Sequence, residues 1–446
     1  MVQTQIEITE VRGGTDSDST DPVSGALDVP VAGSRFDGHF LRISGWALVS
    51  GGAPREIRVI DTGALAGSGD DRILATTRAD RERTDVAQQF SDVANAGRCG
   101  FETSLSLVGL PARFEFAVLA IGEQGKGELA RVIGSRAPLR TRSDPAFDPI
   151  LLNVSGRSGS RWLLQLLGAH PEIVTYRPFE YEPRVASYWM DVFRTIATPP
   201  SLSQQVMPEF EEAIWWVGRR RTLPPLQLAD DPEIQEWLSG GLLENLATFF
   251  QSRIDEFYRR AVASRGAGSP RYFAERAHNR RVTNVIREVY GNVREVFLAR
   301  DFRDVLCSRL AFDRKTGMTQ FGRAPDESDE EYVRGAMRRE LIAFADAVES
   351  AAGPAVLVRY EDLVRRTEES LQRLFDGLGV AAGDEAVRDV LDAVDEQSSS
   401  TQRSHGTSAD ALTSIGRWKR ELDPALARAC NESFGELLRK LGYEAG

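Results

Sequence analysis

The stretch from Ile150 to Ile173, ILLNVSGRSGSRWLLQLLGAHPEI, constrains the fold of this chain more than any other. It begins with a short apolar run, Ile150–Val154, which predicts a buried strand. The loop SGRSGS follows, and leucines then recur at helical spacing until His170 and Pro171 mark a helix end. The first amides of a helix have no intrahelical partner and lie at the positive end of its dipole. A strand, a glycine-containing loop and a helix start therefore predict a cradle for an anion such as a phosphate group.

This loop differs from the Walker A loop, in which a lysine follows the second glycine. Here Ser160 and Arg161 stand at that place, and an ordinary strand-to-helix turn is the simplest alternative for the loop alone. A second strand-to-helix run, VFLARDFRDVLCS, places Arg300 at a strand end and Ser308 eight residues later. The two junctions together favour the anion-binding interpretation.

These two runs resemble the PAPS-dependent sulfotransferases, where PAPS is 3′-phosphoadenylyl sulfate. In that family a loop of the form [KR]SG[ST]xW binds the 5′-phosphosulfate, and RSGSRW at residues 157–162 is similar to it. The family's 3′-phosphate motif is an arginine followed eight positions later by a serine, as in Arg300 and Ser308. RYEDL at 359–363 and GRWK at 416–419 are similar to two later segments. An arginine in the first loop is typical of the bacterial branch that resembles carbohydrate and tyrosylprotein sulfotransferases.

The resemblance covers about residues 148–443 and has one clear departure. Ala411, Leu412 and Thr413 stand where the cytosolic enzymes carry an arginine–lysine–glycine triplet that helps to bind the 3′-phosphate. The resemblance implies an α/β fold over 146–446, with a P-loop-like parallel sheet flanked by helices. The cofactor-binding residues that it implies are Arg157, Ser158, Gly159, Ser160, Arg161, Trp162, Arg300, Ser308, Arg417, Trp418 and Lys419.

The resemblance also implies catalytic roles. Arg157 is expected to stabilise charge on the leaving phosphate, because arginine acts as a donor and a charge rather than as a proton source. Glu180 is expected to be the general base, since a partly buried carboxylate near a cofactor can be tuned toward neutrality. Glu182 and His278 stay open as alternatives for the base. Trp162 either stacks on adenine or is the first core residue of its helix.

The N-terminal third carries a different pattern. Residues 1–34 are polar, acidic and turn-rich, which predicts a disordered tail. Residues 35–142 contain short alternating runs such as FLRISGWAL and FEFAVLAI, separated by turns rich in Gly, Asp and Pro. Such runs predict a small antiparallel β-sandwich ahead of the transferase domain. Trp46 is interpreted as a core aromatic residue and His39 as a surface residue at a strand start.

Composition excludes several functions. Acidic residues outnumber basic ones by 66 to 55, and the net charge of −11 argues against nucleic-acid binding. The three cysteines lie far apart without CxxC spacing, so we expect neither disulfides nor a zinc site. Neither a signal-like segment nor an apolar run long enough for a membrane span is found, and we expect a cytoplasmic protein.

The sequence thus predicts an enzyme that moves a sulfonate group from PAPS to a hydroxyl of a carbohydrate or a small-molecule acceptor, without a metal. A P-loop-type kinase of a small alcohol is one alternative, disfavoured by the missing Gly-Lys-Ser/Thr. The other is a carbohydrate-binding or scaffold protein with a catalytically silent sulfotransferase-like domain, an interpretation that the altered triplet at 411–413 leaves open.

Overall fold

The structure, a computed structural model, describes most of the chain. The described residues are 6–14, 22–36, 39–63, 73–123, 125–139, 141, 143–176, 184–197, 242–265, 269–277, 279–351, 353–395 and 411–444. The chain divides into two compact units. Unit 1 comprises Met1–Asp144, Tyr188–Gln251 and Asn279–Val289, and unit 2 comprises Pro145–Ser187, Ser252–His278 and Tyr290–Gly446.

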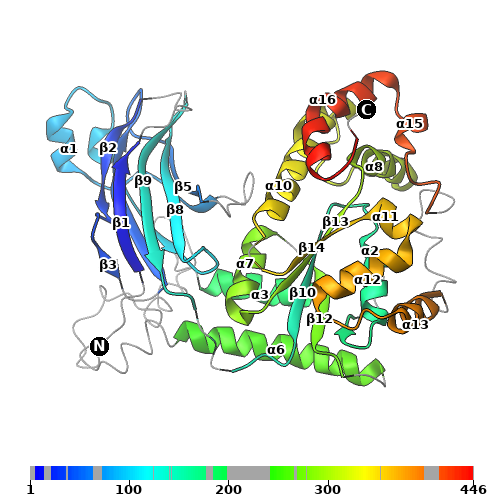
Figure 1. Cartoon of the computed structure of the whole chain (residues 1–446). Helices are drawn as coiled ribbons and strands as arrows, with labels where there is room; N and C mark the ends of the chain where they lie inside the picture. Colours follow the sequence, from blue (N-terminus) through cyan, green and yellow to red (C-terminus); the bar gives the residue numbers. More distant parts are fainter. Residues whose placement is uncertain are drawn as a thin grey trace. The chain divides into compact units, whose positions relative to one another are not determined.

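Unit 1 is built on two antiparallel sheets (Figure 1). One has six strands in the order β3-β1-β9-β8-β5-β6, and the other has three in the order β2-β4-β7. The strands are β1 (Ile6–Gly13), β2 (Ser24–Val29), β3 (Arg35–Phe36), β4 (Phe40–Leu48), β5 (Glu56–Asp61), β6 (Ile73–Thr77), β7 (Gly100–Ser106), β8 (Arg113–Ile121) and β9 (Lys126–Arg136). Alternate residues of both sheets meet in one apolar cluster, to which Ile43, Val59 and Phe116 contribute fully buried side chains. The predicted antiparallel β-sandwich is confirmed.

Helical elements complete unit 1. Two of them, α1 (Thr84–Gln89) and η2 (Ala96–Arg98), lie between β6 and β7 in the chain. The other helices grouped with unit 1 are most of α3 (Val185–Ile196), the first part of α6 (Leu242–Arg265) and nearly all of α7 (Arg280–Tyr290).

Two predictions for unit 1 are wrong. Residues 1–34 were expected to be a disordered tail, yet β1 pairs with β9 and β3, and β2 pairs with β4. Ile6 and Ile8 alternate into the core, so a few apolar side chains at period two outweigh the polar average of the segment. His39, expected at the surface, is 1% exposed. It lies two residues before the inward-facing Leu41, and the same alternation therefore turns it inward.

Unit 2 contains a five-stranded sheet in the order β11-β12-β10-β13-β14, and every neighbouring pair is parallel. Its strands are β10 (Asp148–Val154), β11 (Ile173–Val174), β12 (Tyr272–Arg276), β13 (Arg294–Ala299) and β14 (Ala355–Arg359). The predicted class, a parallel sheet flanked by helices after an antiparallel sandwich, is confirmed. β10 and β13 lie beside each other in the sheet, which brings together the two strand-to-helix junctions seen in the sequence.

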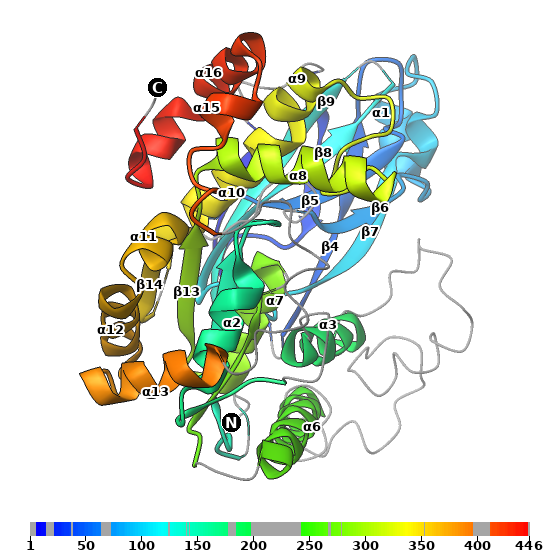
Figure 2. The same ribbon diagram turned by 90° about the vertical axis from the view of Figure 1, so that its right-hand side faces the viewer.

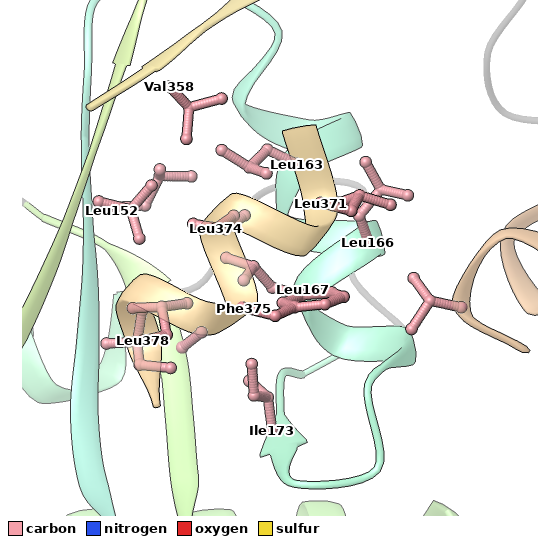
Figure 3. Packing of buried hydrophobic residues seen from close by; sticks show 14 of the residues in the cluster. Leu152, Leu163, Leu166, Leu167, Ile173, Val358, Leu371, Leu374, Phe375 and Leu378 are labelled. Carbon is pink, nitrogen blue, oxygen red and sulfur yellow. The ribbon is translucent and has the colours of Figure 1, made fainter. Parts of the chain in front are cut away.

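Helices cover both faces of this sheet. The described helical elements that lie wholly within unit 2 are α2 (Ser160–Ala169), α8 (Phe302–Thr316), α9 (Asp329–Tyr332), the π-helical turn η5 (Val333–Met337), α10 (Arg338–Glu349), α11 (Tyr360–Arg365), α12 (Thr367–Leu378), α13 (Asp384–Asp395), α15 (Trp418–Glu421) and α16 (Pro424–Lys440). On one face Leu152 and Val358 pack with α2 and α12, as Figure 3 shows, and Figure 2 shows α2, α12 and α13 beside β13 and β14. On the other face Phe297 and Ala299 pack with α8, α10 and α16.

The register of the sheet decides where the functional segments meet. Val154 lies opposite Leu298, and Ala299 lies opposite Arg359, so β10, β13 and β14 end close to one line. The segments that follow these three strands therefore emerge at one edge, the carboxyl edge, where open parallel sheets bind ligands.

Candidate active site

The loop between β10 and α2, residues 155–159, has a backbone conformation that requires a glycine at position 159. Gly159 has a φ of +98°, and a Cβ there would lie 2.7 Å from the ring of Tyr360. A glycine is needed on both counts. Arg157 also has a positive φ, +73°. The hydroxyl of Ser158 donates to the carbonyl of Ser155 at 2.7 Å and closes the loop just ahead of the α2 amides.

A buried arginine of α8 holds this loop. The Arg309 side chain is 1% exposed and donates to Ser155 Oγ at 3.0 Å and to the Gly156 carbonyl at 3.3 Å. The same guanidinium bonds to the Tyr332 hydroxyl and pairs with Glu340, both at 2.8 Å. A buried charge is stable only when it is paired and hydrogen-bonded, and both conditions are met here. Sequence analysis missed Arg309, whose only signal is a charge in an otherwise buried helical run.

Arg300 joins the loop to a distant segment. Its Nη1 donates to the carbonyl of Arg157 at 2.9 Å, and its Nη2 donates to the carbonyl of Ser414 at 2.9 Å. The guanidinium also lies 4.5 Å from the ring centroid of Tyr360, whose hydroxyl is 3.1 Å from Ser414 Oγ. We call residues 411–418, which contain Ser414, the return segment. Arg300 is 5% exposed and so cross-links two pieces of backbone at the carboxyl edge.

The structure brings the two predicted motifs into direct contact. Arg157 Nε donates to Ser308 Oγ at 3.2 Å, although the residues lie 151 positions apart in the chain. The Arg157 guanidinium also lies 4.7 Å from the ring centroid of Phe312, one helical turn beyond Ser308 on α8. The loop arginine therefore lies along α8, beside the serine of the second motif.

Positive charge gathers around Arg157. Burial lowers the pKa of its guanidinium, and the nearby charges of Arg300, Arg417 and Arg161 lower the same pKa further. Arg417 is itself paired with Glu421 at 2.7 Å. Like charges held together in a partly buried site repel one another, so an anion bound among them would be stabilised. The start of α2 adds the partial positive charge of a helix N-terminus at the same loop.

Three predicted cofactor residues have other contacts in the structure. Trp162 is half-buried and packs against the apolar cluster between the sheet, α2 and α12. The Trp418 ring lies 3.9 Å from the Arg303 guanidinium, and Lys419 Nζ lies 5.6 Å from the same ring. Packing on the core is therefore observed for Trp162, and stacking on a protein cation for Trp418.

The candidate bases Glu180, Glu182 and His278 lie outside the described residues. Three residues before His278, the structure shows a buried carboxylate that sequence analysis missed, Glu275 of β12. It accepts from the amides of Ala186 and Ser187, both at 2.9 Å, at the start of α3. The Tyr258 hydroxyl donates to it at 2.8 Å, and burial raises the pKa of Glu275. The signal in the sequence was one acid inside the buried strand YFAER.

The fold and this site define a class: an α/β protein with a P-loop-like loop and a cationic carboxyl edge. Residues 149–384, more than half of the chain, match the Sulfotransferase family. The chain belongs to this family, whose members transfer sulfonate groups, and the predicted family is confirmed. None of the curated proteins matches it.

Several solved structures also contain similar chains. The sulfotransferase domain from the curacin biosynthetic pathway is 15% identical over 68% of this chain and 99% of its own, with a TM-score of 0.38. The sulfotransferase domain from the Synechococcus PCC 7002 olefin synthase is 17% identical over 69% of this chain and 99% of its own, with a TM-score of 0.38. Retinol dehydratase, solved in complex with androsterone and the inactive cofactor PAP, is 18% identical over 67% of this chain and 82% of its own, with a TM-score of 0.37.

Helices long and apolar enough to cross a bilayer are not found among the described residues.

Proposed function

We propose that the chain binds PAPS at the carboxyl edge of the five-stranded sheet and transfers its sulfonate group to a hydroxyl of a carbohydrate or small-molecule acceptor. The observation that carries this proposal is the junction of the two motifs, in which Arg157 contacts Ser308 at 3.2 Å and Arg300 contacts the Arg157 carbonyl at 2.9 Å. The repulsion among the arginines around Arg157 supports a ligand with more than one negative charge. Membership of the sulfotransferase family makes a phosphosulfate the fitting anion.

The donors of the site suit the two anionic groups of PAPS, which carries a 3′-phosphate and a 5′-phosphosulfate on one ribose. We assign the loop and the start of α2, with Ser158, Gly159, Ser160 and Arg161, to the 5′-phosphosulfate, because the positive end of a helix dipole favours such anionic groups. We assign the strand end and α8, with Arg300 and Ser308, to the 3′-phosphate.

The last motif adds charge where the familiar triplet is missing. Arg417 acts on the pKa of Arg157 and is therefore close to the site, whereas Ala411, Leu412 and Thr413 bring no cation. We assign Arg417 to the 3′-phosphate side for this reason. Lys419 adds a further positive charge at the end of the same motif.

We assign the aromatic residues of the site mainly to its framework. Trp418 lies against Arg303, which limits its role to shaping the site. Trp162 packs on the core, and only its remaining exposed surface is left for stacking on adenine.

In the proposed reaction PAPS supplies the activated sulfonate, and the chain supplies position and charge. Sulfuryl transfer resembles phosphoryl transfer, in which aligned groups and charge stabilisation carry most of the catalysis. Arg157 stabilises the negative charge that develops on the leaving phosphate. Glu180 is our proposed base for the acceptor hydroxyl, with Glu182 and His278 as the alternatives. The contacts of Glu275 with the start of α3 support a fixed backbone directly after the segment that carries Glu180.

The test compares nucleotides first and turnover second. PAP carries one phosphate at the 3′ position and one at the 5′ position, whereas ADP carries both at the 5′ position, so PAP should raise the melting temperature of the protein more than ADP does at equal concentration. Labelled PAPS should then transfer its sulfonate to members of a panel of sugars, phenols and alcohols. A larger shift with ADP than with PAP would favour a kinase. PAP binding with no transfer across the panel would favour a silent scaffold.

A further inference from the structure

Asp304, in the first turn of α8, uses both carboxylate oxygens on one distant piece of backbone. Oδ2 accepts from the amide of Gly416 at 2.6 Å, and Oδ1 accepts from the amide of Trp418 at 2.9 Å. Asp304 is 1% exposed, so water cannot replace these two hydrogen bonds when they are lost. Buried carboxylates that accept from backbone amides form strong, charge-assisted hydrogen bonds.

The backbone that Asp304 holds is the return segment, which meets the candidate active site at two points. The Ser414 carbonyl accepts from Arg300, and Arg417 lies close enough to Arg157 to lower its pKa. Gly416 has a φ of +67°, a left-handed conformation in which its amide reaches Asp304. From the β13–α8 junction, Arg300, Arg303 and Asp304 contact this segment.

Asp304 holds the backbone of the return segment beside the three residues that differ from the family's triplet, Ala411, Leu412 and Thr413. The triplet at 411–413 carries no charged side chain, so those three residues bring no cation to a bound phosphate. The placement of the return segment then depends on the protein's own contacts, and Asp304 supplies two that reach its backbone amides.

We infer that Asp304 is a positioning residue of the cofactor site, which fixes the return segment so that Arg417 and the Ser414–Arg300 contact keep their places. This inference rests on the proposed function in one respect, namely that the anion bound there is the nucleotide part of PAPS. Asp304 itself need not touch the nucleotide. Its effect should therefore appear in cofactor affinity more than in the chemical step.

The experiment compares Asp304→Asn with Asp423→Asn. Asparagine keeps the shape of Asp304 but turns an NH₂ group toward a backbone N–H, so one of the two bonds is lost. Asp423 is a matched control, because its carboxylate also accepts from two backbone amides, those of Ala425 and Leu426 at 2.8 and 3.0 Å, but at the start of α16. Burial raises the pKa of Asp304 to about 6, so all assays are run at pH 8, where the carboxylate is ionised.

Asp304→Asn should raise the KM for PAPS and the Kd for PAP about ten- to a hundredfold, as expected for one lost charge-assisted hydrogen bond, with kcat changed less than about threefold. Asp423→Asn should change each constant less than about twofold. In amide hydrogen exchange, a peptide covering Gly416 and Trp418 should exchange faster in Asp304→Asn than in the wild type. Its exchange rate in Asp423→Asn should equal that of the wild type. Equal exchange and equal KM in Asp304→Asn and the wild type would overturn the inference.

Hydrogen exchange also separates this inference from the proposed function. If the wild-type protein bound neither PAP nor PAPS, the proposed function would be refuted. Faster amide exchange in Asp304→Asn would still support the anchoring role. If Asp304→Asn does not fold, the wild type alone decides. Its Gly416 and Trp418 amides should then exchange more slowly than the amide of the exposed Leu412, and equal exchange would refute the anchoring role.

Discussion

Glu288 of α7 offers the sharpest test of the packing in unit 1. Its carboxylate pairs with Arg136 at 2.5 Å, and the two side chains are 5% and 4% exposed. It also accepts from the amide of Gly109 at 2.7 Å and from the amide of Leu139 at 2.5 Å. Glu288→Gln removes the charge and keeps the shape, which leaves a buried arginine without its counter-ion.

The expected loss follows from that burial. Breaking a buried ion pair by removing one partner costs about 3–5 kcal/mol, because the remaining charge cannot be solvated. Arg136 keeps its bonds to the Leu110 carbonyl, so we expect the lower end, about 3 kcal/mol, for Glu288→Gln. The assay is equilibrium urea unfolding followed by fluorescence, with the change in free energy taken at constant slope.

Two further variants make the test specific. Glu7→Gln breaks the exposed pair of Glu7 with Arg35 and should cost less than about 1 kcal/mol. Adding Arg136→Met to Glu288→Gln should recover part of the lost stability, since it removes the unpaired charge. A loss for Glu288→Gln no larger than that of Glu7→Gln would refute the argument from burial.

Three other predictions concern the site and the core. Arg300→Lys should raise the Kd for PAP at least about tenfold, because a single ammonium group cannot keep both carbonyl contacts of the guanidinium. Calorimetric titration measures this Kd, and an unchanged value would contradict the prediction. Glu180→Gln should lower kcat for sulfonate transfer with PAP binding kept, and full activity would shift the role of base to Glu182 or His278. Burial lowers the pKa of His39 from 6.5 to about 4, so its contribution is complete above pH 6.5 and is lost as the pH falls toward 4, by up to about 3 kcal/mol. His39→Leu should therefore show a flatter loss of stability than the wild type over that range in urea unfolding, and parallel curves would contradict this prediction.

The strands and motifs could be predicted because their signals are local. The run Ile150–Val154, the loop after it and the leucines of α2 lie within one stretch of chain, and their periods show in the sequence itself. The same holds for Arg300 and Ser308, whose spacing is fixed by one strand end and one helix. A pattern of this kind needs no knowledge of which strands are neighbours.

The anchoring residues could not be predicted because their partners are distant. Asp304 meets amides 112 and 114 positions later in the chain, and Arg309 meets Ser155 across 154 positions. Glu288 meets the amide of Gly109 across 179 positions. Each appears in the sequence as one more charged residue of a helix, and neither its burial nor its distant partner can be read from the neighbouring residues. His39 was misjudged for the opposite reason, since polarity was weighed above the alternation of its strand.

The eight-residue spacing of the second motif has a structural reason that includes Asp304. Asp304, Ser308 and Phe312 recur every four residues in α8 and so lie on one helical face, and Arg300 stands four residues before Asp304, ahead of the helix. Arg300 and Asp304 bind the return segment. Further along α8, Ser308 and Phe312 contact the side chain of Arg157. Arg300 also donates to the Arg157 carbonyl, so the same residue contacts both the first loop and the return segment. Arg300 and this helical face thus connect the first loop to the return segment, and a change at Asp304 should disturb cofactor binding although Asp304 lies in neither motif's ligand set.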